Sequence, residues 1–176
     1  MVMGNLAYLS LGSNVGDREN HLQDAIRHLE AMGQVTGVSS FYETEPVDFF
    51  DQAWFLNCAV ALETSATPQR LMVSLLGIEH TLGRVRVQKK GPRIIDIDIL
   101  LFGESIVDTP DLKIPHPAMH ERRFVLEPLA EIAPEARHPL LGKTVRELAS
   151  LLPVGQAVHR IAADQRPKAK DSSKEG

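Results

Sequence analysis

The sequence predicts an α+β fold in which helices pack against one antiparallel sheet. Three observations predict it: apolar, strand-like runs, two amphipathic stretches with helical spacing between them, and the absence of an internal repeat. A chain of 176 residues suits one domain that buries roughly two-thirds of its unfolded surface. We expect this single domain over residues 1–164, and a disordered tail over residues 165–176, where apolar side chains are too few to offset the cost of ordering.

A strand and a helix open the chain. Apolar residues alternate over Leu6–Ser13 until Gly12 interrupts them, which is typical of a strand. Asp17 is a suitable N-cap for a following helix, and Gly33 stands where a left-handed C-terminal cap is expected. Between them the apolar residues recur at helical spacing: Leu22, Ala25, Ile26 and Leu29.

Two more strands and a second helix follow. β-Branched and aromatic residues predict one strand within residues 33–44 and another over Trp54–Thr64. Thr67 followed by Pro68 marks a helix start, and Gly83 can end that helix. Its apolar stripe is Leu71, Leu75, Ile78 and Leu82.

One more predicted strand completes the order of strands and helices. It lies within Gly91–Gly103, the stretch GPRIIDIDILLFG, and gives the order βαββαβ. Two helices on one face of an antiparallel sheet in this order form a ferredoxin-like core, and Leu112–Leu152 is expected to add shorter helices.

Composition limits the classes of partner. Nineteen Lys and Arg against twenty-three Asp and Glu give a net charge of −4, which disfavours nucleic acid and anionic membranes as partners. Cys58 is the only cysteine and is expected in the core, and no apolar run reaches 18 residues. We therefore expect a cytoplasmic monomer that acts on small molecules.

Two acids interrupt the last strand. Side chains alternate faces along a strand, so Asp96 and Asp98 share one face with Cα atoms about 6.5 Å apart. Two such carboxylates repel each other unless a cation neutralises them, and oxygen ligands of this number suit Mg²⁺. A solvated sheet face, or pairing of the two acids with arginines, is the alternative interpretation.

A cluster of basic residues precedes the acids and exceeds them in number. Its members are Arg84, Arg86, Lys89, Lys90 and Arg93. A surplus of cations beside a magnesium-type acid pair is what phosphoryl transfer needs, because that chemistry depends on positioning and on charge neutralisation. ATP is the expected substrate on this reasoning.

Four segments resemble one enzyme family. The segments are LSLGSNVGDRENHLQDAI, SSFYETEPV with DQAWFLNCAVALET, GRVRVQKKGPRIIDIDILLFG and IPHPAMHERRFVLEPLAEIAPE. Together they resemble 6-hydroxymethyl-7,8-dihydropterin pyrophosphokinases of the folate pathway. The resemblance implies transfer of diphosphate from ATP to the hydroxymethyl group of the pterin, with release of AMP and participation of two Mg²⁺ ions.

The resemblance also implies a role for particular residues. Asp96 and Asp98 correspond to the metal ligands, and with Arg84, Arg86 and Arg93 they form the expected catalytic set. The expected ATP-binding residues are Glu79, Arg84, Lys89, Arg93, Ile99, His116 and Arg122. The expected pterin-binding residues are Thr44, Val47, Phe55, Asn57, Asp96 and Phe124, with the pterin between the two phenylalanine rings and Asn57 at its polar edge.

Several alternative interpretations stay open at this point. The same acids could serve nucleotidyl transfer with release of pyrophosphate, or the chain could be a catalytically silent ferredoxin-like binding module. Without the family, Phe55 and Phe124 are more often core residues than stacking platforms. His116 and His120 have a spacing seen in zinc sites, but the intervening Pro117 disfavours one continuous helix and no third ligand is evident. GSNVG, residues 12–16, is expected to be a tight strand-to-helix turn in which glycine permits close backbone approach.

Overall fold

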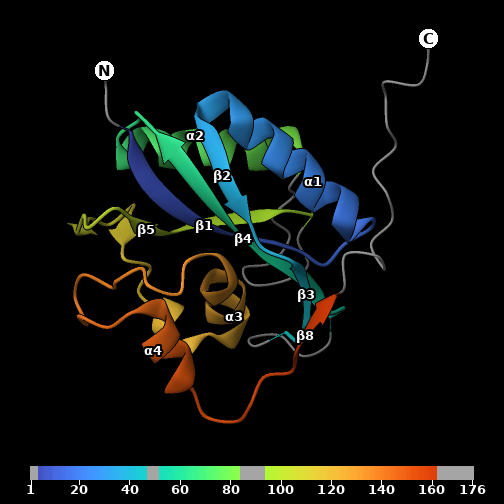
Figure 1. The fold of residues 1–176 in the computed structure, drawn as a ribbon. Coiled ribbons are helices and arrows are strands. Elements are labelled where there is room, and N and C mark those ends of the chain that lie inside the picture. The colour runs from blue at the N-terminus through green and yellow to red at the C-terminus, as the bar shows by residue number, and fades with distance from the viewer. Residues whose placement is uncertain (1–3, 47–51, 84–93, 162–176) are drawn as a thin grey trace.

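The computed structural model describes residues 4–46, 52–83 and 94–161. Within them a six-stranded sheet lies between two layers of helices (Figure 1). Its strands run in the order β5-β1-β4-β3-β8, with β2 also beside β4, and each pairing is antiparallel. Their bounds are β1 Asn5–Ser13, β2 Gln34–Val38, β3 Phe41–Thr44, β4 Phe55–Thr64, β5 Asp96–Phe102 and β8 Val158–Ile161.

Helices cover both faces of this sheet. Figure 1 shows α1 and α2 on one face, and α3 and α4 on the other. Their bounds are α1 Arg18–Leu29, α2 Pro68–Thr81, α3 Arg123–Ile132 and α4 Val145–Ser150. A two-stranded hairpin of β6 Val107–Asp108 and β7 Lys113–Ile114 follows β5, and single 3₁₀ turns occupy Glu30–Met32 and Met119–Glu121. The predicted ferredoxin-like α+β fold, with shorter helices after the core, is confirmed.

Both predicted helix starts are confirmed by their caps. The Asp17 side chain accepts a hydrogen bond from the backbone N–H of Asn20 at 3.2 Å, and the Thr67 hydroxyl accepts one from Arg70 N–H at 3.2 Å. Each bond satisfies one of the N–H groups that the first turn of a helix leaves without an intrahelical partner. At the other end of α2, Gly83 has φ +87°, a conformation that favours glycine and ends the helix.

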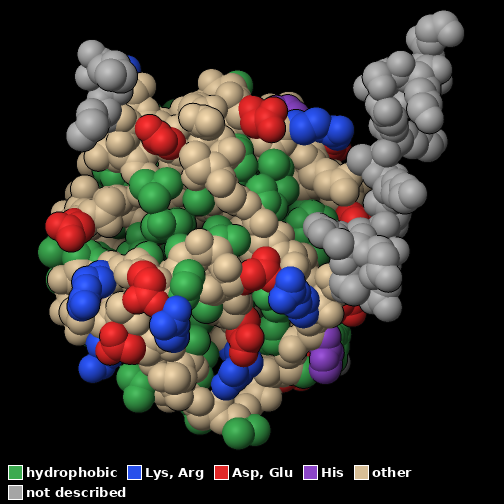
Figure 2. Space-filling view, viewed as in Figure 1, with side chains coloured by type: hydrophobic (Ala, Val, Ile, Leu, Met, Phe, Trp, Pro, Cys, Tyr) green, Lys and Arg blue, Asp and Glu red, His purple; other side chains and the backbone are tan. Residues whose placement is uncertain are grey.

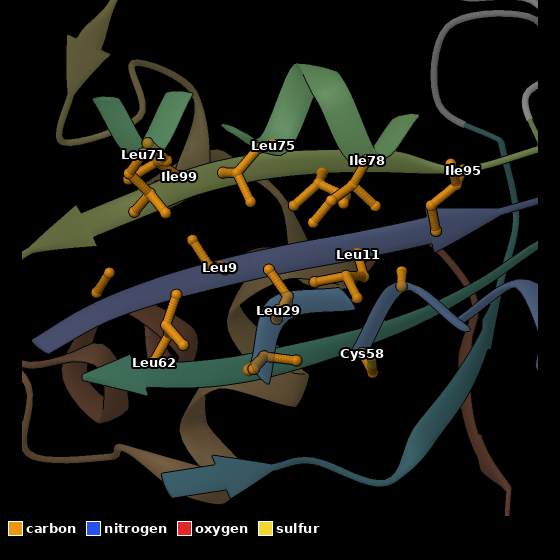
Figure 3. Packing of buried hydrophobic residues seen from close by; sticks show 14 of the residues in the cluster. Leu9, Leu11, Leu29, Cys58, Leu62, Leu71, Leu75, Ile78, Ile95 and Ile99 are labelled. Carbon is orange, nitrogen blue, oxygen red and sulfur yellow. The ribbon is translucent and has the colours of Figure 1, made fainter. Parts of the chain in front are cut away.

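Each face of the sheet has its own apolar cluster. The cluster under α1 and α2 is seen in Figure 3, where Leu9 and Leu11 of β1 meet Leu29 of α1 and Ile78 of α2. Cys58 lies in the same cluster with 1% of its surface exposed, as expected. On the other face, leucines of β5 pack against α3 and α4. Each fully buried leucine contributes about 1.5–3 kcal/mol relative to an exposed one, which holds both layers on the sheet.

The single strand predicted within residues 33–44 is wrong, since the structure has two strands there. Ser39 and Ser40 separate β2 from β3. The Ser39 hydroxyl accepts a hydrogen bond from Ala59 N–H at 2.8 Å and donates one to the Ser40 carbonyl oxygen at 2.7 Å. A side chain that bonds the backbone in this way replaces part of the strand ladder, and this explains the break.

The predicted C-terminal cap at Gly33 is also wrong. Helix α1 ends at Leu29, a 3₁₀ turn follows, and Gly33 has a nearly extended backbone with φ 158° and ψ −152°. A Cβ at Gly33 would collide with the carbonyl oxygen of Glu63. Glycine is therefore required there for close approach to β4 and not for a left-handed cap.

Strand β8 has no counterpart among the predicted elements. Its four residues pair with β3 and extend the sheet beyond the core (Figure 1). The predicted tail over residues 165–176 lies outside the described residues. No helix among the described residues is long and apolar enough to cross a membrane.

Candidate active site

A row of directly paired residues crosses four strands of the sheet. Asp96 of β5 pairs with Gly12 of β1, Gly12 pairs with Asn57 of β4, and Asn57 pairs with Tyr42 of β3. Directly opposed residues of antiparallel strands project to the same face. The Tyr42 hydroxyl donates to a carboxylate oxygen of Glu131 in α3 at 2.9 Å, which identifies this face as the one covered by α3. Asp96 and Asn57 thus lie on one face with only a glycine between them.

The second acid lies on the same face. Asp98 pairs with Ser10, two residues along each strand from the pair of Asp96 and Gly12. The predicted common face of Asp96 and Asp98 is therefore confirmed by the register of β1 and β5. Beyond Asp98 the pairing of β1 and β5 is irregular, because Leu9 pairs with Ile99 but Tyr8 pairs with Leu101. The strict alternation of side chains between the two faces of β5 therefore ends at Leu100.

Gly12 provides the room that Asn57 occupies. A Cβ at Gly12 would lie 2.5 Å from Asn57 Oδ1 and 3.5 Å from a ring carbon of Phe55. The side chains of Asn57 and Phe55 therefore lie where a side chain at residue 12 would be. Gly12 lies inside β1 and not in the turn predicted for GSNVG, and its missing Cβ makes room for a side chain and not for a neighbouring backbone.

Gly12→Ala is expected to destabilise the protein by about 1–3 kcal/mol, because the added methyl group forces Asn57 out of its position. Chemical denaturation followed by circular dichroism measures this loss. Gly37→Ala is the matched control, since its Cβ would meet only the Ala61 Cβ at 3.7 Å. That variant should be unchanged or slightly stabilised through the unfolded chain. Equal losses in the two variants would contradict a specific role for the glycine at residue 12.

The polar side chain of Asn57 is buried and has a defined partner. Only 3% of its surface is exposed, and its Nδ2 donates to the hydroxyl of Thr44 at 2.5 Å. Thr44 in turn pairs with Phe55 across β3 and β4. A buried amide costs free energy unless it is hydrogen-bonded, so this bond fixes the orientation of Asn57. Thr44, Phe55 and Asn57, all predicted pterin-site residues, are brought together.

A pocket of about 390 Å³ opens beside the acid pair, between α2, β5 and the segment after it. Five predicted site residues line it: Glu79, Asp96, Asp98, Ile99 and His116. The others, which the sequence did not single out for this site, are Met72, Leu75, Leu76, Ile97, Asp111, Leu112, Lys113 and Pro117. A cleft with an apolar wall and several polar groups is typical of a small-molecule site.

Glu79 holds the outer edge of β5. It has 4% of its surface exposed, and its Oε1 accepts the backbone N–H of Ile97 at 2.9 Å. That N–H lies on the side of β5 that faces away from β1, the edge of the sheet. The carboxylate therefore tethers α2 to β5 next to the two acids.

His116 lies against charges of both signs. Burial first, and then the guanidinium of Arg122, lower its pKa to about 4, although the carboxylate of Asp96 opposes this shift. Its Nδ1 accepts the backbone N–H of Ala118 at 3.2 Å. The imidazole is therefore neutral at pH 7, with its proton on Nε2 as a hydrogen-bond donor.

Arg122 and Phe124 connect His116 to the start of α3. The Arg122 guanidinium carbon lies 5.5 Å from the centroid of the Phe124 ring, within range of a cation–π contact. Phe124 is partly buried and packs on the cluster under α3 and α4. Arg122 thus stands between an imidazole beside the pocket and an aromatic ring.

Five predicted site residues lie outside the described residues: Val47, Arg84, Arg86, Lys89 and Arg93. Within residues 4–46, 52–83 and 94–161, no group of three or more His, Cys, Asp and Glu side chains could hold a metal ion. In this part of the chain, Asp96 and Asp98 are therefore two carboxylates without a third side chain of these types placed to hold a metal with them. Zinc at His116 and His120 gains no support in this part of the chain, where the ring of His120 lies edge-on to His138.

His138 makes stability depend on pH. Burial and the neighbouring His120 lower its pKa, and its Nδ1 accepts the backbone N–H groups of Leu140 at 3.3 Å and Leu141 at 3.1 Å. Because the folded pKa is depressed, the unfolded chain takes up the proton first as the pH falls. The contribution of neutral His138 to the free energy of unfolding is therefore complete above the ordinary histidine pKa near 6.5, and it is lost progressively as the pH falls below that value.

His138→Asn keeps an acceptor at this position but does not titrate. Between pH 7 and pH 5 the unfolding free energy of the native protein should fall faster than that of the variant, by at most about 1.4 kcal/mol per pH unit for one proton. Urea titrations at several pH values measure the difference. Parallel pH profiles for the two proteins would contradict the role of His138.

Known proteins share the sequence and the fold of this chain. The sequence model of the 7,8-dihydro-6-hydroxymethylpterin-pyrophosphokinase (HPPK) family matches residues 8–134. The chain is 52% identical over 132 residues to the 2-amino-4-hydroxy-6-hydroxymethyldihydropteridine pyrophosphokinase of Bacillus subtilis, covering 74% of this chain and 79% of the relative. It is 49% identical over 152 residues to the enzyme of the same name from Methylorubrum extorquens, covering 85% and 95% of the two chains.

Longer relatives contain a matching part. The folic acid synthesis protein of Dictyostelium discoideum is 40% identical over 157 residues, 89% of this chain but 24% of that protein. A crystal structure of wild-type Plasmodium falciparum HPPK-DHPS with pterin and p-hydroxybenzoate shares the fold, with a TM-score of 0.67, 20% identity and coverage of 85% of this chain and 43% of that one. The family match and the two bacterial relatives lead to one conclusion: the chain belongs to the 7,8-dihydro-6-hydroxymethylpterin-pyrophosphokinase family.

Proposed function

We propose that Asp96 and Asp98 lie between an ATP site and a pterin site and hold two Mg²⁺ ions there. The reaction that they serve is that of the family: the chain is an ATP-dependent diphosphokinase of folate biosynthesis. It transfers the diphosphate group of ATP to the hydroxymethyl group of 6-hydroxymethyl-7,8-dihydropterin and produces AMP.

One observation supports the proposed positions of the two sites. Asp96 lines the pocket beside α2, and through Gly12 it shares a row of the sheet with Asn57. A residue common to both sites is where the phosphate chain of one substrate would meet the hydroxymethyl group of the other. Transfer requires the two reacting atoms to be held within about 3–3.5 Å of each other.

The pterin site is assigned to the face under α3. A pterin is flat and has donors and acceptors along one edge, so aromatic rings supply stacking area and an amide can recognise the edge. Phe55 and Phe124 are proposed as the two rings, and Asn57, oriented by Thr44, as the edge-reading amide. Val47, which lies outside the described residues, is proposed to complete the wall.

ATP is assigned to the pocket. Apolar side chains of Met72, Leu75 and Ile99 offer a surface for the adenine ring, while Glu79 fixes the adjoining strand edge. Neutral His116 can donate a hydrogen bond to a phosphate oxygen, and Arg122 supplies a positive charge beside it. We propose the same role for the predicted cations outside the described residues: Arg84, Arg86, Lys89 and Arg93.

The donor set at Asp96 and Asp98 fits magnesium. Both side chains project from one face of β5, and Mg²⁺ usually takes one or two carboxylates and completes its shell with substrate phosphate and water. When bound, Mg²⁺ neutralises charge on phosphate oxygens during transfer. Because Mg²⁺ would bind the folded chain and not the unfolded one, its binding should stabilise the folded protein.

The reaction forms one bond and breaks one. The pterin hydroxyl oxygen attacks the β-phosphorus of ATP, and the bond from that phosphorus to the oxygen retained by AMP breaks. The hydroxyl proton is lost to water. The chain contributes orientation through Phe55, Phe124 and Asn57, and positive charge through Arg122, where charge spreads over the phosphate oxygens.

Product analysis tests this function. The protein is mixed with ATP, Mg²⁺ and 6-hydroxymethyl-7,8-dihydropterin, and the nucleotides are separated by ion-exchange chromatography. AMP and the pterin diphosphate are the expected products in equal amounts. ADP would overturn the transfer of diphosphate, pyrophosphate would indicate nucleotidyl transfer, and binding without any product would indicate a silent binding module.

We also propose that the chain works as a cytoplasmic monomer. On the side seen in Figure 2, acidic and basic side chains are interspersed and not separated by sign, which suits small substrates better than a nucleic acid. Light scattering across the concentration range of the assay tests the oligomeric state.

A further inference from the structure

We infer that Gln156 is a positioning residue for the pterin, and that it acts by joining the two walls of the proposed pterin site. Gln156 belongs to residues 153–161, here named the C-terminal strap, which end in β8 beside β3 (Figure 1). The inference rests on the pterin site proposed above. No sequence motif pointed to this residue.

The side chain of Gln156 bonds two segments that are far apart in the chain. Its Oε1 accepts the backbone N–H of Phe124 at 3.2 Å, and its Nε2 donates to the carbonyl oxygen of Glu45 at 2.6 Å. Phe124 is one proposed stacking ring, and Glu45 directly follows Thr44, the partner of Asn57. One amide therefore connects the start of α3 to the end of β3.

The backbone of the strap strengthens the contact at β3. Glu45 N–H donates to the Ala157 carbonyl oxygen at 3.1 Å, and Ala157 N–H donates to Glu45 Oε1 at 3.1 Å. The next residue, Val158, pairs with Thr44 in the ladder of β3 and β8. These bonds hold the backbone of Thr44 in the position from which its hydroxyl accepts from Asn57.

Two further contacts reach the same site. The ring of His159 stacks on Trp54, with centroids 6.0 Å apart and planes 3° from parallel, and Trp54 directly precedes Phe55. The Arg123 guanidinium donates to the Pro153 carbonyl oxygen at 2.9 Å, next to Phe124. The C-terminal strap thus contacts a neighbour of each of Thr44, Phe55 and Phe124.

The spacing between the two walls matters because the attraction between a stacked ring and the pterin falls steeply with distance. A gap of 0.5–1 Å beyond contact already loses about a quarter to a half of the dispersion attraction. The side chain of Gln156 bonds both walls, yet it does not line the pocket assigned to ATP. Its loss should therefore weaken pterin binding and leave ATP binding almost unchanged.

The test uses Gln156→Ala in the full chain. We expect the KM for pterin to rise about tenfold, because two hydrogen bonds across the walls are lost, while the KM for ATP stays within about twofold. The Kd for pterin in the presence of a non-hydrolysable ATP analogue should rise by a similar factor. Fluorescence of Trp54, the one tryptophan of the chain, can follow this binding.

Gln156→Glu is the second variant. It keeps an acceptor for Phe124 N–H but places a carboxylate oxygen against the Glu45 carbonyl oxygen where a donor stood, so a rise in the pterin KM is expected even if Gln156→Ala folds poorly. Arg160→Ala is the control, since Arg160 lies in the same strap but bonds Ser40 at 3.1 Å and Glu131 at 3.3 Å. It should leave the pterin KM unchanged.

Three outcomes would overturn the inference. These are a native pterin KM in Gln156→Glu, an equal rise in the KM values for ATP and pterin, or an equal effect of Arg160→Ala. Failure of the proposed function is distinguishable, because the native protein itself would then produce no AMP from ATP and pterin.

Discussion

Asp96→Asn is expected to lower kcat about 10³-fold, the scale of losing one group that stabilises transition-state charge in phosphoryl transfer. The amide keeps the shape of the side chain but cannot carry the negative charge that a divalent cation requires. Asp96 pairs with Gly12 through backbone groups, so the change of its side chain should leave this pairing intact. Single-turnover formation of AMP at saturating Mg²⁺ measures the loss, and Asp98→Asn should behave similarly.

Asp108→Asn is the matched control for this prediction. Asp108 lies on β6, where it pairs with Lys113 at 2.6 Å, and the lysine amine lowers its pKa. The same chemical change there should keep kcat within about twofold, since exposed ion pairs contribute little. Thermal melting of each variant with and without Mg²⁺ gives an independent measurement: the cation should raise the Tm of Asp108→Asn but not of Asp96→Asn. A normal rate in Asp96→Asn would refute the metal role.

Asn57→Leu is expected to raise the pterin KM about 100-fold. The leucine has a similar volume but removes the hydrogen bonds to the ligand edge and leaves the Thr44 hydroxyl without its amide donor. The lost hydrogen bonds to the ligand are together about 3 kcal/mol, which corresponds to roughly 100-fold in affinity, whereas the lost bond to Thr44 lowers stability. Steady-state kinetics with pterin varied at fixed ATP measures the effect.

Cys58→Ala separates this effect from a general loss of stability. Cys58 is the next residue of β4, faces the opposite side of the sheet, and is 1% exposed in the cluster under α1 and α2. Its truncation should cost about 1 kcal/mol of stability through a small cavity and leave the pterin KM unchanged. If Cys58→Ala raised that KM as much as Asn57→Leu, the assignment of Asn57 to the ligand would fail.

The sequence predicts best those parts of the fold that depend on interactions between residues close together in the chain. Asp17 and Thr67 were predicted as caps because a capping side chain reaches only three residues along the chain. The two strands predicted as one show the limit of this reasoning. Both halves have strand composition, and the break depends on the bond between Ser39 and Ala59, twenty residues away.

The site was predicted in the same uneven way. The common face of Asp96 and Asp98 follows from alternation along one strand, and the motifs of the family pointed to Asn57, His116 and Phe124 before any geometry was known. The apolar side of the pocket was not predicted, because Leu75 has the same helical spacing as a core residue and Met72 has no signal at all. Gln156 was missed because a single amide carries no local pattern.

Local patterns and motifs were enough to predict the order of the elements up to β5 apart from the break between β2 and β3, the common face of Asp96 and Asp98, and the family to which the chain belongs. The folded chain was needed to show that Gly12 lies between Asp96 and Asn57 and that the C-terminal strap joins Phe124 to Glu45. The physical reason is the range of the interactions. Caps and side-chain alternation act over a few residues, whereas strand register and bridging hydrogen bonds depend on how distant segments pack together.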